Sequence, residues 1–188
     1  LLRPNNITVI TWAYKSDWDE TSPVSQRLIS KYPNTGSAGW VQYLTGDSGL
    51  FKTAIYVDGS RYEANINVSD IDTGAGWHQI AFTYDGSSLK VYVDAELKQT
   101  NSSPSGNLDS STTNLFIGNQ QNSSNQPVDG DSGRYFNGDI SIVKIYDSAL
   151  TENEIESSYD ALNERFNTPH LTPTRTRTQT PTQTPTQT

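Results

Sequence analysis

The sequence predicts an all-β fold: a two-sheet antiparallel jelly-roll sandwich with one short C-terminal helix and an extended tail rich in threonine and proline. Three observations support this. Several short segments alternate apolar and polar residues, Asp-Gly pairs separate some of them, and one helical periodicity occurs near the end of the chain. Period-two alternation with β-branched and aromatic residues is typical of strands with one buried face. Many short strands at this spacing indicate a sandwich or jelly roll.

Four segments show the alternation most clearly, and in each the apolar residues share one face. These faces hold Ile10, Trp12 and Tyr14 in segment 8–15; Tyr62, Ala64, Ile66 and Val68 in 61–69; Ile80, Phe82 and Tyr84 in 77–84; and Leu89, Val91 and Val93 in 89–94. Asp58-Gly59 and Asp85-Gly86 predict tight turns, because Asp-Gly tolerates positive φ. We expect the strand tryptophans Trp12, Trp40 and Trp77 to lie in the core.

One helix is expected after residue 150. Thr151 followed by Glu154 forms a capping box, in which each side chain satisfies a free backbone N–H of the first turn. An apolar stripe then follows at helical spacing, formed by Ile155, Tyr159, Leu162 and Phe166. Such a helix docks on the sandwich and closes the domain, and Thr168-Pro169 ends it.

The chain divides into a folded domain, residues 1–167, and a linker or stalk, residues 168–188. From residue 172 every even-numbered residue is threonine, and only Pro, Arg and Gln lie between. This composition cannot bury apolar area, so it does not fold alone. The prolines disfavour a central strand, so we expect an extended segment with O-linked glycans. The expected O-glycosylation sites are Thr172, Thr174, Thr176, Thr178, Thr180, Thr182, Thr184, Thr186 and Thr188.

The charge distribution excludes several classes of function. Residues 1–167 hold eleven of the thirteen basic residues and all twenty-one acidic ones, a net charge of −10. An acidic domain does not neutralise phosphates, so nucleic acid is not an expected partner. No apolar run approaches the roughly 20 residues of a membrane span. The chain also has no cysteine, which excludes disulfides and thiolate metal sites.

Two blocks of sequence carry a family resemblance. Residues 76–86 with 89–94 resemble the central hairpin of the laminin G-like jelly rolls, which belong to the concanavalin A-like lectin/glucanase superfamily. Residues 115–118 and 136–155 resemble that family's closing segment. The resemblance implies the fold but no single activity, because members bind carbohydrate, bind proteins or serve as spacers. The family's first strand has no counterpart before Ile7, which suggests a fragment or an edge completed by something else.

The sequence does not favour an enzyme. Laminarinase-type relatives use a Glu-x-Asp-x-Glu run that places two carboxylates on one face, and this chain has no such run. The acidic cluster at residues 17–20 has a different spacing. His78 lies in a predicted strand, so we interpret it as a structural residue rather than a catalytic base.

Calcium is one interpretation of the glycine-rich loop that contains Asp129 and Asp131, because carboxylates on a flexible loop suit Ca²⁺. In many relatives the acidic residues of the closing segment support calcium, but here Ser141 and Ile142 stand at those positions. Asp139 takes the place of those acidic residues only if the strand register here differs from that of the relatives. These departures favour a solvated turn over a calcium site.

Carbohydrate binding would use exposed aromatic rings beside polar side chains. Trp18 lies in a predicted loop and is the best exposed candidate. Tyr135, at the end of the polar loop that begins at Asn119, is the second, and Asn119 itself is the third. Four sequons also occur, and in a chain rich in Asn, Ser and Thr several arise by chance. The possible N-glycosylation sites are Asn6, Asn67, Asn101 and Asn122.

These observations predict a non-catalytic extracellular or cell-surface protein, structural or adhesive, that repeats as a subunit of a glycosylated fibre. Its partners would then be copies of itself. The alternative is a lectin-like carbohydrate-binding module whose linker joins it to other domains, with glycans as partners. Binding of a specific sugar by the unmodified chain distinguishes the second hypothesis from the first.

Overall fold

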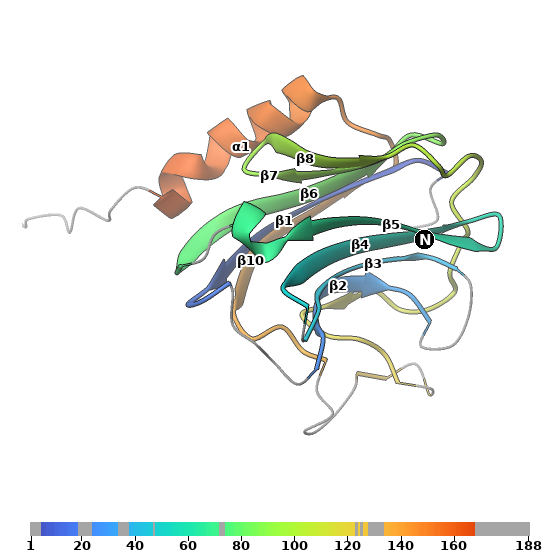
Figure 1. Ribbon diagram of the computed structural model, residues 1–188, viewed down its shortest axis with the longest axis horizontal. Helices are drawn as coiled ribbons and strands as arrows, with labels where there is room; N and C mark the ends of the chain where they lie inside the picture. Colours follow the sequence, from blue (N-terminus) through green and yellow to red (C-terminus); the bar gives the residue numbers. More distant parts are fainter. Residues whose placement is uncertain are drawn as a thin grey trace, which may run out of the picture.

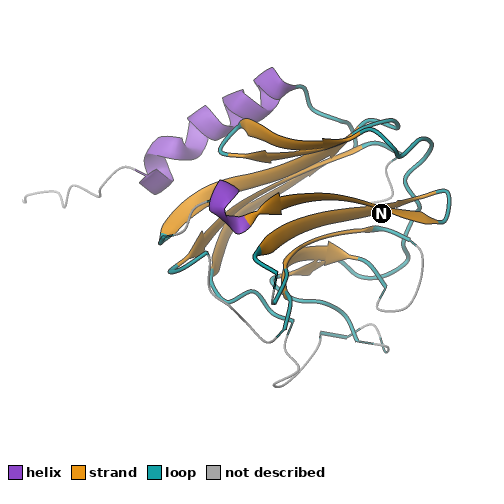
Figure 2. Cartoon of the chain, viewed as in Figure 1, coloured by secondary structure: helices purple, strands orange, loops and turns teal. Residues whose placement is uncertain are grey.

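The chain folds into two five-stranded antiparallel sheets packed face to face, with one helix against the outside (Figure 1, Figure 2). The all-β prediction is therefore confirmed. The computed structural model describes residues 5–18, 24–33, 38–46, 48–71, 74–122, 124, 126–127 and 134–167. The threonine-rich tail, Thr172–Thr188, lies outside the described residues, and so do Asp129 and Asp131.

Sheet A has the strand order β10-β1-β6-β7-β8. Its interior strand β1 pairs with β6 on one side and with β10, from the far end of the domain, on the other. The C-terminal part of the domain is thereby tied to its beginning. The strands of sheet A are β1 (Ile7–Lys15), β6 (Gly76–Tyr84), β7 (Leu89–Val93), β8 (Glu96–Asn101) and β10 (Asp139–Tyr146).

Sheet B has the order β5-β4-β3-β2-β9. Three hairpin-connected pairs, β2 with β3, β3 with β4 and β4 with β5, make up most of it. A short 3-10 helix, η1 (Val68–Asp70), directly follows the edge strand β5. The strands of sheet B are β2 (Gln26–Lys31), β3 (Trp40–Leu44), β4 (Leu50–Val57), β5 (Ser60–Asn67) and β9 (Phe116–Ile117).

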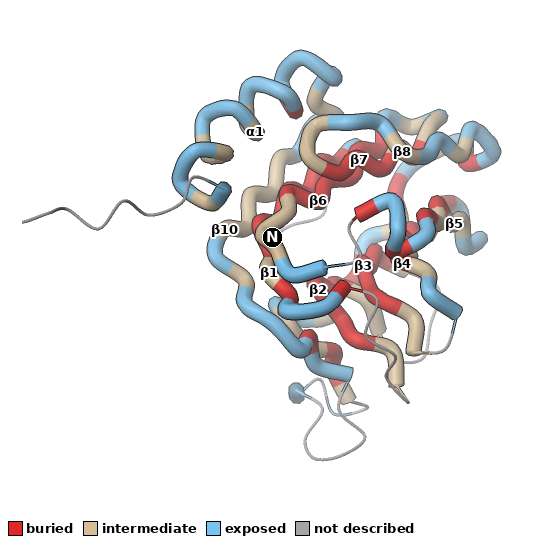
Figure 3. The backbone as a smooth tube through the Cα atoms, turned by 60° about the vertical axis from the view of Figure 1, so that its left-hand side comes forward, coloured by how far each residue is buried: buried red, intermediate tan, exposed pale blue. Residues whose placement is uncertain are grey.

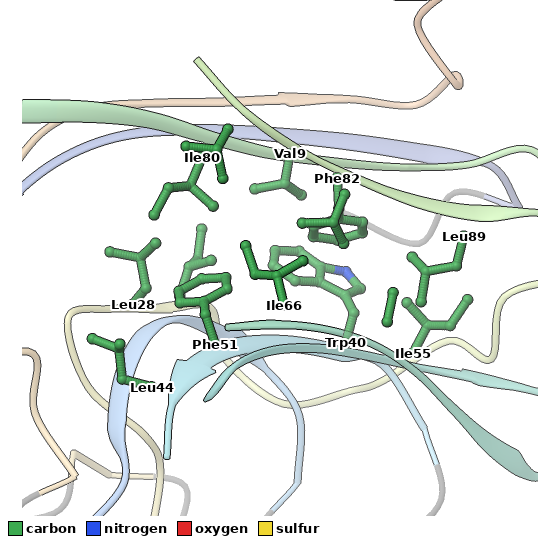
Figure 4. Close-up of a cluster of buried hydrophobic side chains, with 14 of the residues drawn as sticks. Val9, Leu28, Trp40, Leu44, Phe51, Ile55, Ile66, Ile80, Phe82 and Leu89 are labelled. Atoms are coloured by element: carbon green, nitrogen blue, oxygen red, sulfur yellow. The ribbon is translucent and has the colours of Figure 1, made fainter. Parts of the chain in front are cut away.

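The main core lies between the two sheets. In Figure 4, Val9, Ile80 and Phe82 extend from sheet A toward Trp40 and Phe51 of sheet B. The apolar faces predicted for segments 61–69, 77–84 and 89–94 all belong to this core. Period-two alternation was sufficient to predict them because each of these strands turns one face to the opposite sheet.

The outer face of sheet A packs against α1 (Glu152–Asn167). The capping box is confirmed: Thr151 N donates to Glu154 Oε2 at 2.8 Å, and Glu154 N to Thr151 Oγ1 at 3.4 Å. Ile155 is buried, and the Trp12 ring stacks on Tyr159 and Phe166. Among the described residues, no helix has the length and apolar composition needed to cross a membrane.

Two expectations about tryptophans need correction. Trp12 is fully buried, but it lies under α1 rather than between the sheets, because β1 is a central strand with both faces covered. Trp77 is not a core residue. It lies near the start of β6, is only half-buried, and packs against Tyr14 and Phe166. Figure 3 shows the buried residues concentrated in the central strands of both sheets.

The structure confirms one of the two tight turns that the sequence predicts. Asp58 and Gly59 both have positive φ, 48° and 76°, and join β4 to β5 as predicted. Asp85-Gly86 instead begins a longer loop, in which the Asp85 carboxylate accepts bonds from the backbone N–H groups of Ser87 and Ser88. A third turn, Asp94-Ala95, joins β7 to β8, and sequence reasoning missed it because Ala rarely adopts positive φ.

Candidate binding face on sheet B

The outer face of sheet B is not covered by α1, and its side chains form a group separate from the main core. Val41, Tyr43 and Ala54 form their own buried cluster, with Tyr32 packed against it. Their strand neighbours Trp40, Leu44 and Ile55 point the other way, into the core between the sheets. The alternation of side chains along a strand therefore places the first group on the outside.

The strand register extends this outer face across four strands. Ala54 lies opposite Val41 on one side and opposite Glu63 on the other. In the next row, Tyr43 lies between Arg27 and Lys52. We call this set the sheet B face: Arg27 and Ser30 of β2, Tyr32 directly after β2, Val41 and Tyr43 of β3, Lys52, Ala54 and Tyr56 of β4, and Arg61, Glu63 and Asn65 of β5.

A polar network occupies the β5 side of the sheet B face. Arg61 Nη1 lies 2.7 Å from Glu63 Oε1, and Lys52 Nζ lies 3.4 Å from Glu63 Oε2. Asn65 Nδ2 donates to the same Oε2 atom at 3.2 Å. Arg61 also donates to the Tyr43 hydroxyl at 3.0 Å. The charged ends of these side chains are partly exposed, so they remain accessible while the network holds them in place.

Tyrosines form the floor of the face. The rings of Tyr32 and Tyr56 stack with centroids 5.6 Å apart, and their hydroxyls lie 3.4 Å from each other. Burial, and then the hydrogen bond with Tyr32, raises the pKa of Tyr56 to about 12. Tyr56 is therefore a neutral phenol at ordinary pH, able both to donate and to accept a hydrogen bond.

Arg27 lies at the β2 side and is only 7% exposed. Its guanidinium lies 4.1 Å from the centre of the Tyr43 ring, and its Nε donates to Gln120 Oε1 at 2.7 Å. The exposed Arg134 reaches the same Gln120 oxygen at 3.4 Å. Burial lowers the pKa of Arg27 to about 10, and the positive charge of Arg134 acts in the same direction.

These groups suit binding better than hydrolysis of a glycosidic bond. On the outward positions of β2 to β5, all of which the structure describes, Glu63 is the only carboxylate. Glycoside hydrolysis ordinarily uses two carboxyl groups on either side of the scissile bond. The face offers instead fixed donors, acceptors and aromatic rings on rigid strands, which are the features of a recognition site.

Trp18 does not lie on this face, and the expectation that it is exposed is wrong. It is 1% exposed and belongs to the main core. Its Nε1 donates to the Gly76 carbonyl at 3.2 Å, and its ring packs against His78 and Phe136. A residue in a loop can therefore be buried by partners far along the chain, and the local sequence contains no sign of them.

The other two predicted carbohydrate residues lie beside β2. Tyr135 is 52% exposed, as expected, and forms an isolated backbone bridge with Arg27. Asn119 precedes Gln120, the acceptor of the Arg27 bond, and its own Oδ1 accepts from the Gln120 N–H. The structure thus brings the polar loop to the edge of the sheet B face. A role for either residue in sugar binding stays a prediction.

The calcium prediction stays open. Asp129 and Asp131 lie outside the described residues, and Asp139 is exposed at the start of β10. Within the described part of the chain, no three side chains of the metal-binding types come together. His78 Nδ1 lies 2.7 Å from Asp94 Oδ2, and Asp94 Oδ1 accepts from the Gln79 N–H, an arrangement that fits the structural role expected of this histidine.

The four sequons differ in accessibility. Asn6 and Asn67 are exposed, while Asn101 and Asn122 are half-buried. The Nδ2 atom of Asn101, to which a glycan would attach, donates to the Glu63 carbonyl at 2.8 Å. Because Asn6 and Asn67 are exposed, they are the better candidates. All four stay predictions.

Sequence reasoning missed Arg27, Tyr43, Tyr56, Arg61 and Glu63. The alternation that identified the buried faces of the strands also contains the signal for these outward residues. In segment 61–66, the residues between Tyr62, Ala64 and Ile66 are Arg61, Glu63 and Asn65. The polar half of a strand indicates a site only when several strands are aligned, and that alignment depends on the register of the sheet.

A laminin G family model, described as the concanavalin A-like lectin/glucanases superfamily, matches residues 1–156. The chain belongs to this superfamily. The match confirms the resemblance found in residues 76–94 and in the closing segment. A search of curated proteins finds no match.

Several solved structures share the fold of this superfamily member. The binding domain of botulinum neurotoxin serotype G is 16% identical, with a TM-score of 0.62, and the match covers 84% of this chain and 36% of that one. The receptor-binding domain of the mosaic serotype C/D neurotoxin is 15% identical, with a TM-score of 0.61, covering 84% and 37%. A neurotoxin DC binding domain in complex with SialylT is 12% identical, with a TM-score of 0.59, covering 84% and 36%. The chain thus spans little more than a third of these proteins, and the likeness concerns the fold.

Proposed function

We propose that this chain is a non-catalytic extracellular binding domain that takes carbohydrate on the sheet B face. The observation that carries the proposal is the contrast between the two sheets: α1 covers the outer face of sheet A, whereas the outer face of sheet B carries a partly exposed polar network beside a largely buried tyrosine cluster. Sugars are recognised by such combinations, because their hydroxyls both donate and accept hydrogen bonds and their rings pack on aromatic faces.

Two further observations support binding without catalysis. Glu63 is engaged by Arg61, Lys52 and Asn65, so it is placed as a hydrogen-bond acceptor rather than as a free acid. The solved structures of similar fold are described as binding or receptor-binding domains, one of them in complex with SialylT and another with rat synaptotagmin II. Those ligands belong to those proteins; here they support only the use of this fold for recognition.

The alternating threonines favour a second function, a repeating subunit of a glycosylated surface fibre. Nine threonines occupy every even position from 172 to 188. A dense row of O-linked glycans would stiffen an extended segment and present the sandwich away from a surface. The two functions are compatible, because an adhesive domain on a glycosylated stalk both binds and extends.

Binding of the purified 188-residue chain to a panel of immobilised glycans tests the main proposal. We expect at least one glycan class to bind, and Tyr56→Ala and Arg61→Ala to weaken that binding about tenfold, since each removes a hydrogen bond or a ring contact. Lys98→Ala, on β8 of sheet A, is the matched control and should bind as the parent does. A folded chain that binds no glycan contradicts the proposal.

Mass and sedimentation measurements on material from the natural source test the fibre. We expect excess mass on the peptide that covers residues 168–188, and assemblies much larger than one chain. A monomeric chain with an unmodified tail excludes the fibre and leaves the binding function untouched.

A further inference from the structure

The sheet B face carries an excess of positive charge in an acidic domain. Arg27, Lys52, Arg61 and Arg134 gather here, although residues 1–167 hold only eleven basic residues against twenty-one acidic ones. Glu63 is the one carboxylate on the outward positions of β2 to β5, and it already pairs with Arg61 and Lys52. Arg27 and Arg134 are therefore the cations of this face whose charge Glu63 does not balance.

Arg27 and Arg134 share a neutral acceptor. Arg27 Nε and Arg134 Nη1 both donate to Gln120 Oε1, at 2.7 and 3.4 Å. Two like charges converge on one amide oxygen, and their repulsion is one of the reasons that the pKa of Arg27 is lowered. A buried guanidinium is normally stabilised by a carboxylate, because removal from water costs several kcal/mol per ion in the absence of a counter-charge.

The guanidinium of Arg27 also keeps unused hydrogen-bonding capacity. Its Nη1 atom is buried and has no hydrogen-bond partner among the residues that the structure describes. Nearby on the same strand, the buried Ser30 hydroxyl likewise lacks a partner in that part of the chain. Native structures rarely leave such groups unsatisfied, and a missing ion or ligand is one of the recognised explanations.

We propose that the sheet B face selects acidic glycans, and that Arg27 and Arg134 together hold the carboxylate or sulfate group of the acidic sugar. This inference rests on the proposed carbohydrate binding and specifies its ligand class. Arg134 is exposed and approaches the anion first. The anion then replaces Gln120 as the acceptor between the two guanidiniums, which opens Arg27 to the ligand.

The rest of the face fits a glycan chain attached to that anion. Arg27, Tyr43, Lys52 and Asn65 lie in one row across β2, β3, β4 and β5. With strands about 4.8 Å apart, this row is about 14 Å long, which exceeds one sugar ring. Neutral sugars that follow the acidic one would run along this row toward Lys52 and reach Asn65 and Glu63, which supply a donor and an acceptor for hydroxyls.

Matched pairs of glycans test the inference. The probes are sialyllactose with lactose, a glucuronate-ended trisaccharide with its glucose-ended equivalent, and a sulfated chondroitin hexasaccharide with its desulfated form. We expect the parent chain to bind at least one acidic member about tenfold more tightly than its neutral partner, because a charge-assisted bond contributes more than a neutral one. The pair that responds distinguishes carboxylate from sulfate, and this preference should fall as salt is raised.

Three variants assign the preference to these residues. Arg134→Gln should remove most of the acidic preference, whereas Arg134→Lys should keep part of it. Arg27→Met, which replaces the buried guanidinium by an uncharged chain of similar length, should also remove it, and its melting curve shows whether the variant folds. Lys98→Gln removes the same charge from sheet A and should keep the full preference.

The outcomes separate the inference from the function on which it rests. Equal binding of acidic and neutral partners, or a full acidic preference in folded Arg134→Gln, overturns the inference and leaves carbohydrate binding intact. Binding of an immobilised poly-glutamate peptide in place of every acidic glycan also overturns it, because the anion site would then serve a protein ligand. Failure to bind any glycan overturns the proposed function itself.

Discussion

The outer faces of the two sheets both carry aromatic residues, but these residues have different surroundings on each sheet. On sheet A, the aromatic side chain of Trp12 is sealed under Tyr159 and Phe166 of α1. On sheet B, Tyr32 and Tyr56 stack on each other with their hydroxyls among charged groups. Aromatic residues in strands therefore do not indicate by themselves a core or a site. The deciding factor is whether another element covers the face, and here α1 covers only sheet A.

The largest expected effect is on the covered face. Trp12→Ala should lower the free energy of unfolding by about 3–5 kcal/mol, because it empties the space between sheet A and α1. Tyr32→Ala on sheet B should cost about 1 kcal/mol, the size of one lost aromatic pair. Urea denaturation measures both. Equal losses would mean that the sheet B face serves stability as much as the helix-covered face does.

A smaller effect compares one hairpin from each sheet. Ala95 in the β7–β8 turn has φ 67°, whereas the β4–β5 turn has Gly59 at φ 76°. Because an L-residue with a Cβ is strained in this region, Ala95→Gly should stabilise the protein by about 1 kcal/mol, and Gly59→Ala should destabilise it by a similar amount. No atom lies within 4 Å of a Cβ placed at Gly59, so that cost is conformational only. Thermal melting of the two variants should show shifts of opposite sign.

Alkaline pH should destabilise the sheet B face through Tyr56. The folded state raises the pKa of Tyr56 from its ordinary value of 10.0 to about 12, so the neutral phenol is the form that folding favours. This contribution to stability is complete below about pH 10 and is lost as the pH rises through about 12. The fraction of unfolded protein, followed by tyrosinate absorbance, should therefore rise less steeply with pH in Tyr56→Phe than in the parent chain over this interval. An unchanged profile would mean that Tyr56 is accessible to water in the folded state.

Removal of divalent cations should have the smallest effect on stability, and it should not change the packing of either sheet face. The sequence favours a solvated turn over a calcium loop at residues 128–133, since Ser141 and Ile142 replace the acidic residues of many relatives. We expect EDTA to leave the melting temperature unchanged. A fall of several degrees that added Ca²⁺ restores would establish a bound cation, because a ligand of the folded state stabilises it by mass action.

The sequence by itself determined the local features of this protein. The alternation in segments 61–69, 77–84 and 89–94, the Asp58-Gly59 turn and the Thr151 capping box each depend on neighbours a few residues away, and each was predicted correctly. The family resemblance likewise depends on residues close together in the chain, and the family model confirmed it.

Only the tertiary structure decided which side chains are buried and which sheet face α1 covers. Trp18 is buried because Gly76 and Phe136, 58 and 118 residues further along the chain, close around it. The sheet B face exists because strand register aligns Arg27, Tyr43, Lys52 and Asn65, and Arg27 meets Arg134 only through a loop that returns to β2. Burial and charge pairing depend on neighbours in space, and a period-two pattern specifies two faces of a strand without specifying what lies against each.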